Sequence, residues 1–208
     1  NTAQKKAVDN ALRDFELSGA LLQGPARSEY AQLASEAAQL QAKFSENLLD
    51  ATNAYEYFAR HDELAGIPED AVIAMREAAA EDEREGYKIT LHYPSFFPVI
   101  QYADDRGLRE RIYRANVTRA SDLGDATLDN TAIMQRLLEI RQRVAQLLGY
   151  ANHAEVSLAP KMAESVAQVT AFLFDLSDKA RPFAEQDMAQ LRAFASSHLQ
   201  LNDLQAWD

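Results

Sequence analysis

Apolar side chains recur at steps of three and four along most of the chain, which is the spacing of an amphipathic α-helix. Glycines and capping residues divide this pattern into segments. Gly19 and Gly149 each follow the last periodic residue of a segment, where a left-handed glycine commonly ends a helix. The pattern predicts helices over about residues 2–17, 28–58, 68–85, 99–102, 106–118, 129–148 and 165–198.

The segment 28–58 carries an unbroken apolar stripe. A helix of this length would span roughly 45 Å, about the width of a domain. The stripe consists of Tyr30, Leu33, Ala37, Leu40, Phe44, Leu48, Ala51, Tyr55 and Phe58. Its length indicates a coiled-coil hairpin with a neighbouring helix.

The segment 165–198 is predicted to be a second long helix. Ser165 and Gln168 have the spacing of a capping box at its start, and Pro182 is expected to kink it in the middle. Its predicted inner face consists of Val169, Phe172, Leu173, Leu176, Ala180, Phe183, Leu191 and Phe194.

One segment alternates as a strand does. From Tyr87 to Tyr93, apolar and polar residues alternate along the chain, which is the period of a β-strand. Pro94 and Pro98 follow this segment. Because no second segment shows this period, we expect a short strand without a partner, ended by the prolines.

The composition favours helices over sheets. The chain has 37 alanines but only 7 glycines and 6 prolines, so good helix formers are common and turns are few. Hydrophobic residues make up 47% and charged residues 25%, which is ordinary for a folded globular protein. We predict an all-α, multihelical fold with long antiparallel helices and one short strand-like segment. No linker interrupts it, so residues 1–208 are predicted to form a single helical region.

The net charge and the absence of cysteine limit which partners the protein can bind and in which compartment it is expected. A formal net charge of −11 repels phosphate backbones, which argues against nucleic acid as a partner. No apolar run approaches the roughly 18–20 residues of a membrane helix, so no membrane partner is expected. The chain has no cysteine, which excludes disulfides and cysteine–zinc clusters and fits a reducing compartment. We therefore expect a cytoplasmic protein.

Candidate chemistry is sparse. The histidines are His61, His92, His153 and His198. None lies four residues from another, so no zinc-binding His-Glu-x-x-His helix is present. The arginines crowd into one segment as Arg106, Arg109, Arg111, Arg114 and Arg119. They suit either a pocket for a carboxylate or phosphate, or a helix laced by ion pairs to Asp104, Asp105 and Glu110, and we favour the second interpretation.

Six motifs in series carry a resemblance. They are Asp-Asn-Ala-Leu-Arg-Asp-Phe-Glu-Leu-Ser-Gly at 9–19, Leu-Leu-Asp-Ala-Thr at 48–52, Gly-Tyr-x-x-Thr-Leu followed by Pro-Ser-Phe-Phe-Pro-Val within 86–99, Arg-x-x-x-Tyr-Arg-Ala-x-x-Thr-Arg-Ala-Ser at 109–121, Leu-x-x-Arg and Ala-Gln-Leu-Leu-Gly within 138–149, and Ser-Leu-Ala-Pro-Lys-Met-Ala at 157–163. In this order they resemble the thimet oligopeptidase family of zinc metallopeptidases, nearest its bacterial oligopeptidase A branch. The resemblance covers nearly the whole chain.

The resemblance implies a part of a neurolysin or thimet oligopeptidase-like fold. In that family the amino-terminal half builds one wall of a deep channel that admits short peptides, and a downstream His-Glu-x-x-His motif with a further glutamate holds the zinc. The chain begins at Asn1 and ends before such a motif, so we expect an amino-terminal piece of a larger enzyme. We assign it no catalytic or metal-binding residue, and its substrate-binding residues stay unknown. Its expected partners are short peptide substrates of the parent and the missing downstream catalytic region.

A second interpretation comes from another class of protein. The Tyr30–Phe58 stripe would also suit a stand-alone helical module that binds a partner helix. On the first interpretation, the piece should expose an apolar surface that the parent buries, with the strand and the long helix as the expected carriers.

Overall fold

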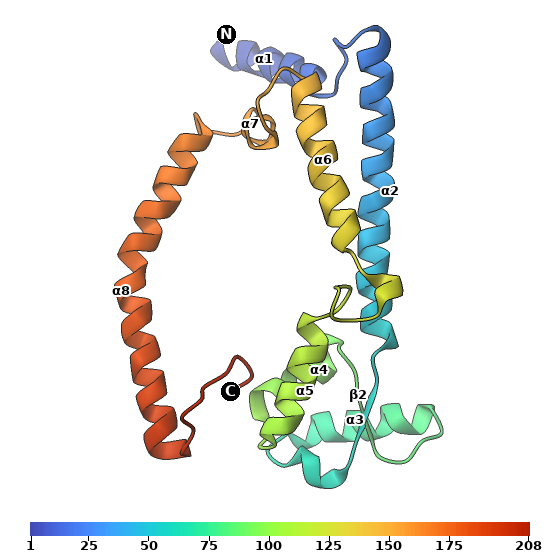
Figure 1. Ribbon diagram of the computed structural model, residues 1–208, viewed down its shortest axis with the longest axis vertical. Coiled ribbons are helices and arrows are strands. Elements are labelled where there is room, and N and C mark those ends of the chain that lie inside the picture. The colour runs from blue at the N-terminus through green and yellow to red at the C-terminus, as the bar shows by residue number, and fades with distance from the viewer. The chain divides into compact units, whose positions relative to one another are not determined.

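The computed structural model describes all residues from 1 to 208 and is mainly helical, as predicted (Figure 1). In chain order the elements are α1 (Thr2–Leu17), α2 (Gly24–Ala54), β1 (Tyr57–Ala59), the 3₁₀ turn η1 (His61–Leu64), α3 (Glu69–Glu81), β2 (Tyr87–Ile89), α4 (Tyr93–Tyr102), α5 (Arg106–Val117), the 3₁₀ turn η2 (Ala126–Leu128), α6 (Thr131–Leu147), α7 (His153–Leu158) and α8 (Val166–Leu199). The chain divides into two compact units: residues 1–41 with 133–202, and residues 42–132 with 203–208.

In unit 1, the first part of α2 and the helix α6 form an antiparallel pair. Arg136 binds Glu36 at 2.7 Å, and Arg143 binds Glu29 at 2.5 Å. Glu29 and Glu36 are seven residues apart on α2, and their partners on α6 are also seven residues apart but in the reverse order. A spacing of seven residues is the heptad repeat of a coiled coil. The buried residues here are Leu33, Leu137, Ile140 and Ala145. The helix α6 therefore supplies the neighbour that the long apolar stripe predicted.

The ends of α1 and α6 follow the sequence prediction closely. Gly19 and Gly149 have φ angles of +77° and +84°, and each stands just past the end of its helix. After α6, the amides of Gly149 and Tyr150 donate to the carbonyls of Gln146 and Ala145, which satisfies two otherwise free helix carbonyls. A residue with a Cβ pays for this conformation, which is why glycine marks both stops.

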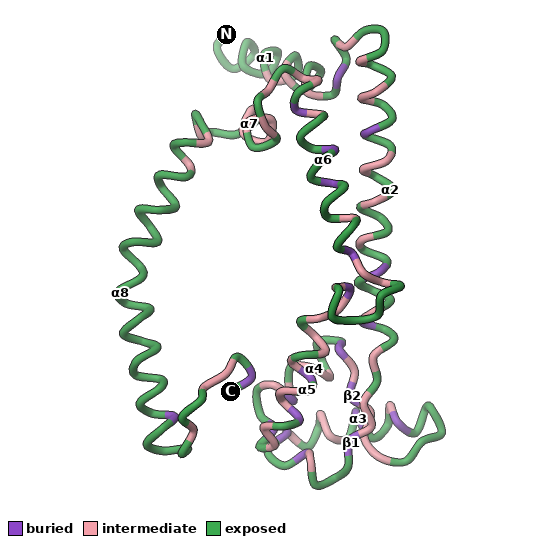
Figure 2. Tube along the Cα trace, viewed as in Figure 1, coloured by how far each residue is buried: buried purple, intermediate pink, exposed green.

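The helix α8 forms where it was predicted, but nearly all of its residues are exposed (Figure 2). Ser165 caps it by accepting from the amide of Gln168, and the helix continues through Pro182. The expected inner face is wrong for this chain, because Ala195 is the only buried residue of α8. Its large apolar side chains, Phe172, Leu173, Leu176, Phe183, Leu191 and Phe194, are between 52% and 69% exposed.

The helix α1 has the same property. Its stripe residues Val8, Leu12 and Phe15 are all more than half exposed, and the helix contains no buried residue. The expectation of an exposed apolar surface is therefore met, but on α1 and α8. The long stripe of α2 is mostly half-buried instead.

Unit 2 is built around a two-stranded antiparallel sheet. Tyr57 pairs with Ile89, Phe58 with Lys88, and Ala59 with Tyr87. The helices α3, α4 and α5 pack about it, and the core consists of Ala59, Leu64, Ile67, Met75, Ile89, Leu91, Val99, Ala103, Leu108 and Ile112.

The expectation of a strand without a partner is wrong. The strand β2 covers only Tyr87–Ile89, and β1 pairs with it where the sequence predicted the end of a helix. The helix α2 stops at Ala54, although the stripe continues to Phe58, because the pairing of residues 57–59 with a distant segment outweighs the local period.

Two further helices differ from the prediction. The helix α4 begins at Tyr93 and contains both Pro94 and Pro98, so these prolines do not simply end the strand. Pro94 falls in the first turn, where a missing N–H costs nothing. The short helix α7 was not predicted, and Asn152 caps it by accepting from the amide of Glu155.

Candidate functional site

The five clustered arginines diverge. Arg111 lies over the ring of Tyr57, at 4.8 Å from its centre. Arg119 donates to the hydroxyl of Thr52 and to the carbonyl of Asn116. Arg111 lies on α5 and Arg119 lies just past its end, and the two have different partners, so no single pocket gathers all five arginines.

The favoured ion-pair interpretation holds for one arginine. Arg114 binds Glu110, four residues earlier, at 2.7 Å. Asp105 instead caps α5 by accepting from the amide of Leu108 at 2.9 Å. A capping carboxylate of this kind satisfies a free helix amide and opposes the positive end of the helix dipole.

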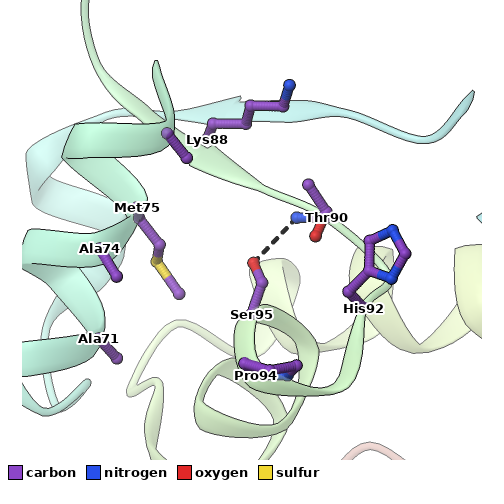
Figure 3. Close-up of a pocket in the computed structure, with 9 residues that line it drawn as sticks. Ala71, Ala74, Met75, Lys88, Thr90, His92, Pro94 and Ser95 are labelled. Atoms are coloured by element: carbon purple, nitrogen blue, oxygen red, sulfur yellow. Dashed lines mark hydrogen bonds between the residues drawn. The ribbon is translucent and has the colours of Figure 1, made fainter. Parts of the chain in front are cut away.

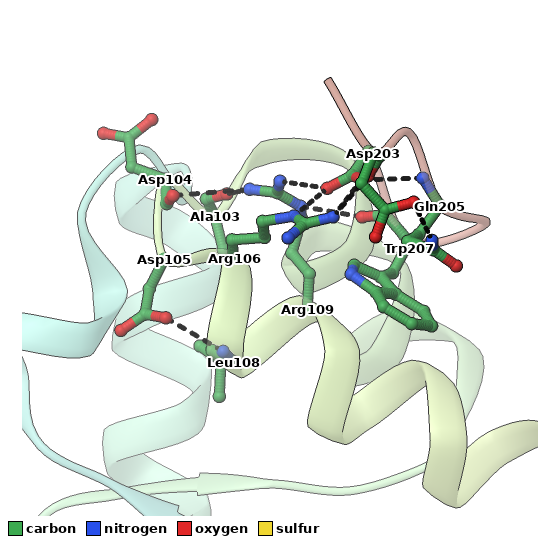
Figure 4. Close-up of polar contacts among 10 residues, drawn as sticks. Ala103, Asp104, Asp105, Arg106, Leu108, Arg109, Asp203, Gln205 and Trp207 are labelled. Carbon is green, nitrogen blue, oxygen red and sulfur yellow. Dashed lines mark hydrogen bonds and ion pairs between the residues drawn. The ribbon is translucent and has the colours of Figure 1, made fainter. Parts of the chain in front are cut away.

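The other two arginines, Arg106 and Arg109, bind the carboxylate of Asp208, which lies far from them in the sequence (Figure 4). Arg106 donates to both side-chain oxygens of Asp208, at 2.8 and 2.9 Å, and Arg109 donates to one of them at 3.1 Å. The Asp208 side chain is only 3% exposed. Its hydrogen bonds to Arg106, with those to Gln205 and Arg109, lower the pKa of the Asp208 carboxyl to about 2.

Arg106 and Arg109 therefore form ion pairs, as the favoured interpretation expected, but with Asp208 in place of Asp104, Asp105 or Glu110. Sequence reasoning missed Asp208 because it lies about a hundred residues away. The one available signal was Trp207, the only tryptophan, next to an acidic residue in a polar terminal segment.

A cavity of about 250 Å³ lies between α3 and the segment from β2 to α4 (Figure 3). Its walls are mainly apolar. They consist of Ala71, Ala74, Met75, Ala78, Lys88, Thr90, His92, Pro94 and Ser95.

Two polar side chains of this cavity, Lys88 and Ser95, have partners in the structure. The Lys88 ammonium binds Glu56 at 2.6 Å and Asp82 at 2.5 Å, which raises the pKa of Lys88. The hydroxyl of Ser95 accepts from the amide of Thr90 at 2.9 Å. This hydrogen bond joins the segment after β2 to the first turn of α4.

The histidines occupy four separate places. His61 contacts the Tyr87 hydroxyl through Nδ1 at 3.0 Å, and His92 precedes the first turn of α4. Burial, with Arg141 and Lys161 nearby, lowers the pKa of His153. Nδ1 of His198 lies 2.8 Å from the Ser197 hydroxyl. That hydroxyl also lies 2.8 Å from the Ala193 carbonyl of its own helix.

No three of the histidines and acidic residues come together as a metal site. The residues of this chain therefore do not fit a zinc ion, which needs three or four such ligands around one point. No helix combines the length and the hydropathy that crossing a membrane requires.

Two kinds of comparison place the chain among known proteins. The model of peptidase family M3 matches residues 99–208. Oligopeptidase A of Salmonella typhimurium and that of Escherichia coli are each 48% identical to the chain over 211 residues. These alignments include the whole chain but only 31% of each relative.

A plant relative shows the same proportions. The probable cytosolic oligopeptidase A of Arabidopsis thaliana is 38% identical over 216 residues, which cover 99% of the chain and 30% of the relative. The chain thus spans about a third of the length of the curated relatives that it matches.

Proposed function

The chain belongs to peptidase family M3, and from that premise we propose that it is the non-catalytic helical part of a zinc-dependent metalloendopeptidase. In this proposal the parent hydrolyses short peptides inside a deep channel, and residues 1–208 act as one region that forms part of the channel wall. The observation that carries the proposal is the alignment of the whole chain with less than a third of oligopeptidase A at 48% identity.

The zinc belongs to a part of the parent outside this chain. The residues present do not fit the metal, because no three potential ligands come together. We therefore derive no step of the hydrolysis from these residues. Their role in the proposal is to form and support a surface beside which peptides bind, with no group that gains or loses a proton in the reaction.

The exposed face of α8 is an argument that this helix packs against another part of the parent protein, the downstream catalytic region. Its six apolar side chains lie at helical spacing on one side. A contiguous apolar face of this kind marks an interaction surface. The net charge of −11 argues against nucleic acid as an alternative partner. The plant relative is named cytosolic, and this supports a cytoplasmic location for the protein.

The test compares the 208-residue chain with the full-length protein on a quenched fluorescent short peptide. We expect the full-length protein to cleave the peptide and to lose this activity with a zinc chelator, because metal-bound water is the nucleophile in such enzymes. We expect the chain alone to show no cleavage above buffer, and metal analysis after dialysis to find well under one zinc per chain. A folded protein substrate serves as the size control and should stay intact.

Cleavage by the chain alone, or one zinc per chain held after dialysis, would contradict the non-catalytic role. A full-length protein that cleaves no peptide would contradict the parent activity. It would favour the second interpretation, a helical module that binds a partner helix.

A further inference from the structure

The last six residues of the chain are folded back on α5 by more than the Asp208 ion pair (Figure 4). Arg106 also donates to the carbonyl of Asp203 at 2.8 Å, and Arg109 donates to the carbonyl of Trp207 at 2.8 Å. The same Arg109 reaches the carbonyl of Ala103, just before α5, at 2.6 Å. Each guanidinium therefore joins α5 to two or more points of the terminal segment. The several N–H donors of one planar arginine side chain make this possible.

The segment is also closed on itself. A side-chain oxygen of Asp208 accepts from the amide of Gln205 at 2.9 Å, and the Gln205 side chain donates to Asp203 at 2.7 Å. The carboxylate is thus the centre of a turn as well as the partner of two arginines. A buried carboxylate with several charge-assisted hydrogen bonds is a strong and directional anchor.

An apolar contact completes the attachment. The indole of Trp207 is 9% exposed, and its ring centre lies 5.7 Å from that of Tyr113. The guanidinium of Arg114 lies over the same indole at 4.8 Å, a cation–π distance. Polar and apolar contacts to α5 therefore fix adjacent residues of the terminal segment.

The position of this segment in the chain gives the attachment its meaning. Residues 133–202 belong to unit 1, while residues 42–132 before them and residues 203–208 after them belong to unit 2. Just before this stretch, Asn130 is held inside unit 2 by Asn47, which donates to its side chain at 2.9 Å. The segment 203–208 and the helix α5 that it contacts both belong to unit 2.

We propose that residues 203–208 form a clasp on α5, locked by Asp208 between Arg106 and Arg109. The clasp tethers the polypeptide that follows α8 to unit 2 and so fixes the point from which the longer protein continues. The second part rests on the proposed function. With the clasp closed, residues 203–208 are fixed on α5; with it open, they are free to leave α5.

Trp207 reports the clasp directly, because it is the only tryptophan. In the wild-type chain we expect the emission of a buried indole. Asp208→Asn keeps the shape of the side chain and removes its charge, and Arg109→Gln removes the second arginine. Both should shift the emission to longer wavelength. Because the Gln205 amide donates to the Asp208 carboxylate and hydrogen bonds to a charge are strong, amide exchange of Gln205 should become about tenfold faster or more.

The matched control is Arg143→Gln, which breaks a similar two-pronged ion pair, with Glu29 in unit 1. It should leave the Trp207 emission unchanged. Far-UV circular dichroism of every variant should match the wild type, which separates an open clasp from an unfolded chain. In the double variant Arg106→Gln with Asp208→Asn, the second substitution should add little, because both remove the same contact.

A fully exposed indole in the wild type would overturn the clasp, as would unchanged emission and exchange in Asp208→Asn. These measurements involve no peptidase activity. An inactive full-length protein would therefore sink the proposed function while leaving the clasp in place, and a failed clasp would leave the proposed function standing.

Discussion

Asp208 ties the stability of unit 2 to pH. Its carboxyl has a pKa of about 2 in the folded chain, against a usual value of 3.8, chiefly because Arg106 donates to it. A lowered pKa in the folded state means that the unfolded chain binds the proton more readily. The stabilisation is therefore complete above about pH 4 and is lost as the pH falls towards 2.

Replacing this carboxyl should remove that dependence. We expect Asp208→Asn to lower the free energy of unfolding at pH 7 by about 1–3 kcal/mol, since it removes hydrogen bonds to a buried charge. Between pH 4 and 2 the variant should lose less stability than the wild type. Urea unfolding followed at several pH values measures both effects. Parallel curves for the two proteins in this range would contradict the assignment.

Gly66 is the position where a side chain is least tolerable. Its φ is +86°, and a Cβ there would lie 2.8 Å from a carboxylate oxygen of Asp104 and closer still to the carbonyl of Tyr102. Gly66→Ala should therefore cost about 2–4 kcal/mol, from left-handed strain and overpacking together.

Gly149 offers a matched control for this substitution. Its φ of +84° is nearly the same, but a Cβ there would meet nothing within 4 Å. Gly149→Ala should cost only the backbone strain, about 1–2 kcal/mol. Denaturant unfolding of the two variants gives the comparison, and equal losses would show that the crowding at Gly66 is relieved without cost.

At the scale of elements, the sequence predicted the helices whose bounds depend on local hydrophobic periodicity and capping residues. The helices α1, α5, α6 and α8 lie within a few residues of their expected bounds, because caps and glycine stops are local signals. The strand pair was missed for the opposite reason. Only the register of Tyr57–Ala59 against Tyr87–Ile89 makes the first segment a strand, and no local pattern encodes a partner about thirty residues away.

The candidate site was also predictable only in its local part. The arginine cluster at 106–119 was visible in the sequence, and so was the choice between ion pairs and a carboxylate pocket. The actual partner of Arg106 and Arg109 was not visible, because hydrogen bonds to Asp208 depend on how distant parts of the chain meet. Charge spacing predicts pairs within a helix, such as Glu110 with Arg114, and no others.

At the scale of the whole molecule, periodicity identified an apolar face on α8 but not its burial. A period of 3.6 shows that one side of a helix is apolar, and burial then depends on what packs there. In this chain the face of α8 is exposed, and α1 repeats the pattern. Both observations fit a protein whose relatives are about three times longer than this chain.

An exposed face of this size should make the 208-residue chain self-associate. We expect sedimentation over a concentration series to show oligomers, and a hydrophobic dye to bind, because apolar patches beyond a few hundred Å² are unusual on monomers.

Replacing Leu176 and Phe183 on the face with glutamine should reduce both signals. Phe174→Gln is the matched control, since Phe174 is 66% exposed but lies two residues from Phe172, on another side of the helix. It should change the signals much less. A wild-type chain that stays monomeric at high concentration and binds no dye would mean that α8 needs no partner. Equal effects of the two sets of substitutions would mean that general hydrophobicity, and not this face, drives the association.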